Sequence, residues 1–107
     1  MTLKQLALKF RDDKKMKVNI TFGGPLARYA GIEKVEIELS EKARFKDLLS
    51  EIGSRYGPNM PQLIWDADRG SFTHHVLAMK GFKNLSDLKE PLNNGEEIKF
   101  FLIMVGG

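Results

Sequence analysis

Residues 34–56 read KVEIELSEKARFKDLLSEIGSRY, and their hydrophobic period changes partway along the stretch. From Lys34 to Leu39 apolar and charged residues alternate, which indicates a strand with one buried face. The stretch then takes up the period of a helix, with apolar side chains at Phe45, Leu48, Leu49, Ile52 and Tyr56. Gly57-Pro58 ends this helix, and Ser40 is the nearest candidate for its N-terminal cap. We therefore predict a strand followed by a helix that packs one face on a sheet.

An earlier stretch repeats the strand pattern. Apolar and polar residues alternate over residues 17–22, and Gly23-Gly24-Pro25 then breaks the alternation. A loop to about Glu33 separates this strand from the one at 34–39. We expect the two strands to pair as an antiparallel hairpin with a long loop.

The C-terminal half alternates short apolar runs with turn signals. Runs at 63–65 and 73–79 predict two strands, and the chain closes with a third that starts at Glu97. Turn-forming residues separate them, and Leu85 and Leu88 indicate a brief helical turn. The order of the elements predicts an α+β fold, with a mixed sheet of four to five strands and one main helix packed across one face.

The composition is that of a globular domain. The sequence has 107 residues, of which 42% are hydrophobic and 29% are charged, and this length favours one domain. The longest apolar run, residues 100–105, is far shorter than the roughly 20 residues that cross a bilayer as a helix. No apolar stretch near the start has the length of a secretory signal, so we expect a cytoplasmic protein. The absence of cysteine excludes disulfides, thiolate metal sites and cysteine nucleophiles within the sequence.

The net charge of +3 is spread unevenly. Residues 1–17 hold six basic and two acidic side chains, whereas the other 90 residues hold 11 basic and 12 acidic ones. The body therefore lacks the basic stripe with interleaved aromatic residues that is typical of a nucleic-acid binder. We predict neither nucleic acid nor a membrane as a partner.

The first residues form a separate segment in our interpretation. Leu3, Leu6, Ala7 and Phe10 have the spacing of about two turns of an amphipathic helix. Such a helix either frays or docks on the body, or it binds a partner. We assign residues 1–15 to an accessory N-terminal segment and residues 16–107 to the folded domain.

Catalytic candidates are few. His74 and His75 are the only histidines, and as neighbours on a predicted strand they should point to opposite faces, which prevents them from binding one metal ion together. Asp66 and Asp68 share a turn, and turn formation explains them better than a cation site. Gly23-Gly24 follows a strand but lacks the pattern of a phosphate-binding loop. We therefore predict no catalytic residue and no metal site, and a protein that is not an enzyme.

The C-terminal pair Gly106-Gly107 directly follows an apolar strand. Two residues without side chains can lie extended in a narrow tunnel and leave the terminal carboxylate unhindered. Because a carboxylate is a poor acylating agent, it would need activation, most simply by adenylation with ATP on a separate enzyme. The alternative interpretation is a flexible end.

The last strand has two different faces. If Ile98, Phe100 and Leu102 face the helix, Lys99, Phe101 and Ile103 lie on the opposite face because the side-chain period of a strand is two. A lysine followed by two large apolar side chains is typical of a docking surface. The alternatives are a strand buried on both faces or a face covered by the N-terminal segment.

Over about residues 16–107 the sequence resembles the ubiquitin-like sulfur carriers. This family includes the small subunit of molybdopterin synthase, the thiazole sulfur carrier and the ubiquitin-related modifier. The matching stretches are Val18–Phe22, Gly23-Gly24 with Leu26, Phe45–Leu49, His75–Met79 before Gly81, Leu92–Ile98, and Val105-Gly106-Gly107. The resemblance implies a ubiquitin-like β-grasp fold.

The resemblance also implies a chemistry for the tail. An ATP-dependent, ubiquitin-activating-type adenylyltransferase would adenylate Gly107, which would then become a thiocarboxylate and donate its sulfur on a partner enzyme. Gly106 would give clearance, and Phe101, Ile103, Met104 and Val105 would contact partners. No cofactor would be bound to the chain itself.

Three functions remain open at this point. The first is a sulfur carrier for molybdopterin, with the large subunit of molybdopterin synthase as partner. The second is a protein modifier that is conjugated through Gly107 to target lysines or serves tRNA thiolation; the loop Phe22-Gly23-Gly24 is closer to this group, although the sequence lacks its usual His-Gly-Gly ending. The third is a β-grasp binding module that forms no conjugate. The sequence leaves the activating enzyme, the pathway and the oligomeric state undetermined.

Overall fold

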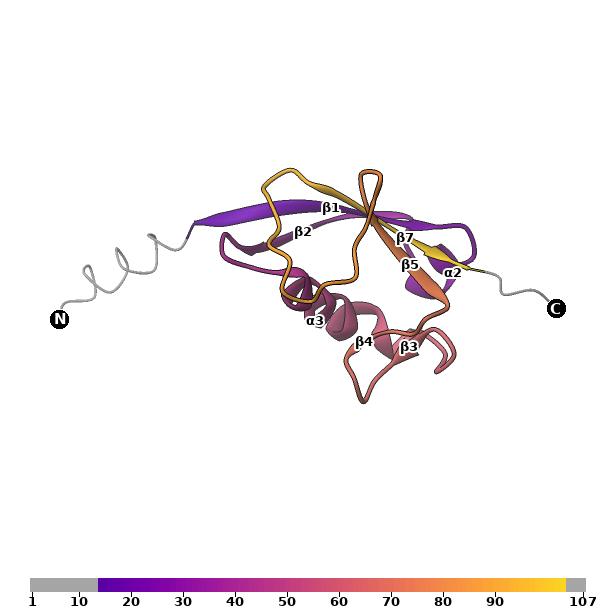
Figure 1. Ribbon diagram of the computed structural model, residues 1–107. Coiled ribbons are helices and arrows are strands. Elements are labelled where there is room, and N and C mark those ends of the chain that lie inside the picture. Colours follow the sequence, from indigo (N-terminus) through magenta and orange to yellow (C-terminus); the bar gives the residue numbers. More distant parts are fainter. Residues whose placement is uncertain (1–13, 104–107) are drawn as a thin grey trace.

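A computed structural model describes residues 14–103. The first two strands of this part of the chain form the predicted hairpin (Figure 1). Strand β1 spans Lys15–Gly23 and pairs antiparallel with β2, Lys34–Ser40. Alternate residues of β1 are buried, because only one face of this strand meets the core. The predicted pairing of the two strands is confirmed.

The connection between β1 and β2 is not a simple loop. It contains a short helix, α2, Leu26–Ala30, whose first and last residues are buried. Gly31 follows it with a φ of 77°, the left-handed conformation that ends many helices. We predicted only a loop here, because five residues are too few to show a helical period.

The main sheet has five strands and is mixed. Strand β7, Glu97–Leu102, lies parallel to β1 and antiparallel to β5, Val76–Lys80, and the short strand β6, Lys83–Asn84, pairs with β5. The strand order is β2-β1-β7-β5-β6. The C-terminal strand therefore runs through the middle of the sheet, and the prediction of a mixed sheet of four to five strands is confirmed.

Helix α3, Phe45–Tyr56, lies across one face of this sheet (Figure 1). Its buried side chains are four of the five that define the predicted apolar stripe, namely Phe45, Leu48, Leu49 and Ile52. The predicted cap is wrong: the hydroxyl of Ser40 accepts from the Lys42 N–H, whereas Asp47 Oδ2 accepts from the Arg44 N–H at 2.8 Å where the helix begins. A 3-10 turn, η1, Gly57–Asn59, follows the helix.

The core lies between α3 and the two central strands. Val18, Ile20 and Phe22 of β1 and Ile98 and Phe100 of β7 are almost completely buried. The ring centroids of Phe22 and Phe100 are 6.0 Å apart. The alternation that predicted one buried face for each strand is confirmed in both.

A second, two-stranded sheet lies beside the helix. It consists of β3, Trp65–Asp66, and β4, Ser71–Phe72, joined by a turn. The predicted strand at 63–65 is therefore shifted toward the C-terminus. The reason is a turn in which the backbone N–H groups of Ile64 and Trp65 both donate to Pro61 O.

Two further expectations differ from the structure. Strand β5 begins at Val76 instead of Thr73, because residues 73–75 form a turn in which the Val76 N–H donates to Thr73 O. The helical turn expected at Leu85 and Leu88 is absent: Leu85 is buried in an irregular segment, and Leu88 is half exposed.

Within residues 14–103, no helix is long and apolar enough to cross a membrane. Residues 1–13 lie outside the described part of the chain, so the accessory segment assigned to residues 1–15 stays a prediction. Residues 104–107 also lie outside it.

Candidate functional site

The face of β7 that points away from α3 carries exposed apolar side chains. Phe101 is 39% exposed and Ile103 is 41% exposed, whereas Ile98 and Phe100 on the other face are fully buried. Lys99 shares the outer face and is exposed. The two faces of this strand therefore differ as predicted, and the outer one is not covered by any residue of the described part of the chain.

Glycine on the neighbouring strand lets the Phe101 ring lie flat against the sheet. Gly23 of β1 pairs with Phe101 of β7. A Cβ atom added to Gly23 would lie 2.6 Å from Phe101 Cδ1 and 2.9 Å from Cε1, much closer than real contacts allow. The glycine that ends β1 is therefore required for the position of this ring.

Strand β5 contributes the other half of the surface. Leu77 pairs with Phe101 and Met79 pairs with Lys99, so both side chains share the outer face, and both are half-buried. Directly paired residues of neighbouring strands project to the same side of a sheet. We call Leu77, Met79, Phe101 and Ile103 the outer-face patch.

The C-terminal end of β7 is held by one more hydrogen bond. The Ile103 N–H donates to His75 O at 2.6 Å, one residue beyond the last strand residue. This bond continues the ladder between β5 and β7 and fixes the direction in which the chain leaves the sheet. Met104, Val105, Gly106 and Gly107 follow this point and lie outside the described residues, so their predicted roles stay predictions.

The two histidines are arranged differently from our expectation. They lie in the turn before β5, and their ring centroids are 4.1 Å apart, so they do not point to opposite faces of a strand. Our argument against a shared metal ion was therefore based on a wrong conformation. Between Lys14 and Ile103 there is nevertheless no group of three or more histidine and carboxylate side chains that could hold a metal ion.

The aspartate turn has a structural role. Asp66 Oδ1 accepts hydrogen bonds from the backbone N–H groups of Asp68 and Arg69, at 3.0 and 3.1 Å. An aspartate side chain that bonds to the backbone two residues ahead is a common device of turns. The prediction that Asp66 serves the turn is confirmed.

A charged cluster ties β5 to the entry of β7. Lys80 Nζ lies 2.9 Å from Glu90 Oε2 and 3.4 Å from Glu96 Oε2, and Lys83 Nζ lies 3.0 Å from Glu90 Oε1. The hydrogen bond with Glu90 raises the pKa of Lys80, and the bonds from Lys80 and Lys83 lower the pKa of Glu90. We did not identify this cluster from the sequence, because its members share no helix or strand whose period would bring them together. It lies at the opposite end of β7 from Ile103.

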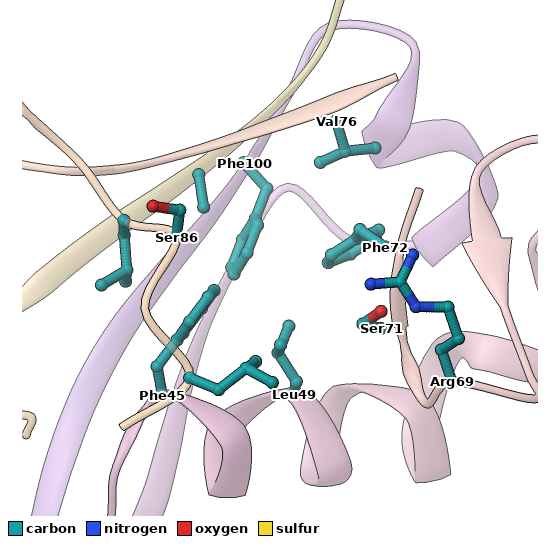
Figure 2. A pocket seen from close by; sticks show the side chains of 11 residues that line it. Phe45, Leu49, Arg69, Ser71, Phe72, Val76, Ser86 and Phe100 are labelled. Carbon is teal, nitrogen blue, oxygen red and sulfur yellow. The ribbon is translucent and has the colours of Figure 1, made fainter. Parts of the chain in front are cut away.

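A pocket opens on the helix face of the sheet (Figure 2). Its volume is about 270 Å³, and the rings of Phe45, Phe72 and Phe100 form much of its wall together with the polar residues Arg69, Ser71 and Ser86. None of the described residues that line it is a histidine or a carboxylate. The pocket therefore offers no general base to activate its serines, and it lies on the other face of the sheet from the outer-face patch.

Comparisons with known proteins give no match at the level of sequence families. No protein-family model matches the chain, and no curated protein matches it.

Solved structures, in contrast, match closely in fold. SAMP1 from Haloferax volcanii aligns with a TM-score of 0.69 and 20% identity over 85% of this chain and 99% of its own. A molybdopterin converting factor subunit 1 from Pyrococcus furiosus aligns with a TM-score of 0.65 and 26% identity over 83% and 99%. Urm1 from Trypanosoma brucei aligns with a TM-score of 0.68 and 15% identity over 88% and 98%.

These three structures include the molybdopterin and modifier types to which the sequence was compared above. The resemblance is therefore confirmed, and the fold is the ubiquitin-like β-grasp, of the α+β class. Because the identities lie between 15% and 26%, the choice between a molybdopterin role and a modifier role does not follow from them.

Proposed function

We propose that this protein is a sulfur carrier whose C-terminal carboxylate is the reactive group. The observation that carries the proposal is the Gly106-Gly107 pair, which follows the central strand β7 and the exposed Phe101 and Ile103 in the sequence, in a fold shared with SAMP1, Urm1 and a molybdopterin converting factor subunit. The chain itself acts as a carrier and catalyses no reaction.

The chemistry takes place on a separate adenylyltransferase of the ubiquitin-activating type. The Gly107 carboxylate attacks the α-phosphorus of ATP, which releases pyrophosphate and leaves an acyl-adenylate. Hydrosulfide then attacks the acyl carbon and displaces AMP, and loss of its proton leaves a thiocarboxylate on Gly107. ATP is consumed by the enzyme, and no cofactor stays bound to the carrier.

Each part of the tail has a role in this proposal. Phe101 and Ile103 contact the partner enzyme, because they form the exposed apolar surface nearest the tail. Met104 and Val105 extend that contact, and Gly106 lets the tail pass through a narrow channel to the reacting atoms.

We place the carrier in the cytoplasm and favour molybdopterin synthesis as its destination, with the large subunit of molybdopterin synthase as the sulfur-accepting partner. The name of the Pyrococcus furiosus protein, a molybdopterin converting factor subunit, supports this choice. A second candidate is a protein modifier that uses the same activated Gly107 to acylate a lysine on a target protein. It is supported by SAMP1, which is a small archaeal modifier protein.

Two experiments separate the candidates. Deletion of Gly106 and Gly107 should abolish the function of a carrier or a modifier and leave the fold intact, whereas a binding module that forms no conjugate would keep its function. A modifier should also form conjugates of high mass in cell extracts that survive thiol reductants, and a carrier should not. Function retained in the deletion variant would contradict the proposal.

A further inference from the structure

Strand β2 forms a long free edge of the main sheet. It stands at the end of the strand order and has β1 as its only neighbour in the described structure. Seven consecutive residues, Lys34–Ser40, pair with β1 in regular register, and none of them is a proline or a glycine. The opposite edge, β6, has only two residues. Natural sheets usually blunt such an edge with a short strand, a bulge, a proline or charged side chains, and β2 has only the charged side chains.

The backbone groups that this edge presents follow from the pairing. The Phe22 N–H donates to Glu33 O at 2.7 Å and the Glu41 N–H donates to Lys14 O at 2.9 Å, at the two ends of the ladder. In an antiparallel ladder every second residue bonds to the neighbouring strand. Odd-numbered residues of β2 therefore bond to β1, and the N–H and C=O groups of residues 34, 36 and 38 point away from the sheet.

The side chains along this edge are self-complementary in charge. Lys34, Glu36 and Glu38 are exposed on the outer face, and Val35 between them is half-buried on the helix face. Oppositely charged side chains stabilise a strand pair when they lie directly across from each other, and like charges destabilise it. A positive residue two positions before a negative one can satisfy this rule against a second copy of itself.

We propose that two copies of this chain pair antiparallel through β2, with the two-fold axis at Val35. This register opposes residues 34–36 of the two strands, and residues 37–40 extend past the start of β2 in the other copy. It places Lys34 of one copy opposite Glu36 of the other, twice, and brings the two Val35 side chains together. An axis at Glu36 would place the two Glu36 side chains opposite each other, and an axis at Ile37 would place Glu36 opposite Glu38. Of these three axes, only the one at Val35 places opposite charges across from each other on both sides of the axis and brings no like charges together.

The rest of the structure is compatible with this dimer. Glu36 lies 3.7 Å from Lys17 in the same chain, but both side chains are more than half exposed, so this ion pair is weak. The association closes after two copies, because each chain has one long edge. Strand β1 separates β2 from β7, so the dimer leaves the outer-face patch free. One strand pair gives a small interface, and the dimer should therefore form as the concentration rises.

Molar mass as a function of concentration tests the proposal, measured by sedimentation equilibrium on the full chain. The mass should rise from 12.1 kDa toward twice that value. Lys34→Glu should hold the protein at the monomer mass, because it places two like-charged pairs at the centre of the interface. The double variant Lys34→Glu/Glu36→Lys restores opposite charges and should dimerise again.

Lys42→Glu is the matched control, because Lys42 is exposed and lies outside the strand. It should dimerise like the unmodified chain, and unchanged far-UV circular dichroism should show that every variant is folded. A monomer mass at all concentrations would overturn the proposal. So would a dimer that Lys34→Glu leaves intact, or a double variant that remains monomeric.

Discussion

The ring of Phe101 lies over the α-carbon of Gly23, so that no side chain fits between them. The two residues are paired in the parallel ladder of β1 and β7, and a Cβ atom on Gly23 would lie 2.6 Å from Phe101 Cδ1. Residues 78 positions apart in sequence thereby form one surface. Gly23 therefore makes room for a side chain of the proposed docking surface, in addition to its place before the turn that follows β1.

Gly23→Ala should therefore destabilise the protein and displace the Phe101 ring. We expect a loss of about 1–3 kcal/mol in the free energy of unfolding, the usual cost of forcing an extra methyl group into a filled space. Urea denaturation measures it. In a Phe101→Ala background the ring is gone, so the same glycine substitution should cost much less. Equal costs in the two backgrounds would contradict the contact.

The two neighbouring phenylalanines of β7 should differ in their contribution to stability. Phe100 is fully buried, and Phe100→Ala should cost about 3–5 kcal/mol. Phe101 is 39% exposed, and Phe101→Ala should cost about 1 kcal/mol. The Phe101 variant should nevertheless bind the adenylyltransferase more weakly, as measured by isothermal titration calorimetry. Wild-type affinity in this variant would remove Phe101 from the proposed docking surface.

The single tryptophan reports on the packing of the helix. A Cβ atom on Gly53 of α3 would lie 2.5 Å from Trp65 Cζ2. Gly53→Ala should therefore push the indole ring outward, shift its fluorescence emission to longer wavelength and destabilise the fold by about 1–3 kcal/mol. Ser50→Ala is the matched control, because Ser50 is exposed on the same helix. Gly31→Ala would not serve, because Gly31 has a positive φ that alanine rarely adopts. An unchanged emission spectrum in the Gly53 variant would contradict the contact.

The charged cluster around Lys80 should give stability that depends on pH in a defined direction. The pKa of Glu90 is lowered in the folded protein, so its contribution is present above the ordinary value of 4.5 and is lost as the pH falls through the lowered value. The pKa of Lys80 is raised, so its contribution is present below the ordinary value of 10.5 and is lost as the pH rises through the raised value.

Lys80→Met should therefore lower the melting temperature at neutral pH. The difference from the wild type should shrink in strong acid, below the lowered pKa of Glu90, and again in strong base, above the raised pKa of Lys80. Thermal unfolding followed by circular dichroism across the pH range measures both changes. A difference that stays constant from acid to base would show that the cluster contributes through packing alone.

Regular periods made most of the fold predictable from the sequence. The period of two in β1, β2 and β7 and the stripe of α3 identified the core face of each element, since one side of each meets the same core. The exposed positions of Phe101 and Ile103 followed from the same alternation. The contact of Phe101 with Gly23 did not, because it depends on the parallel pairing of distant strands.

The errors have physical reasons as well. Helix α2 has five residues and shows no period. The turn at His74 and His75 is set by Thr73, whose carbonyl oxygen accepts from the Val76 N–H and whose hydroxyl oxygen accepts from the His75 N–H. A run of apolar residues does not reveal these bonds. The cap of α3 was assigned to the wrong residue. The side chain of Asp47, which lies inside the first turn of the helix, accepts a hydrogen bond from the Arg44 N–H, and we looked for a cap only before the helix.

The intact mass of the protein after incubation with a matched adenylyltransferase, ATP and a sulfide source tests the central claim most directly. We predict an increase equal to the replacement of one oxygen by sulfur in the wild type, and no increase in a variant that lacks Gly107. An unchanged mass for the wild type, with an enzyme that converts another carrier under the same conditions, would contradict the sulfur-carrier account.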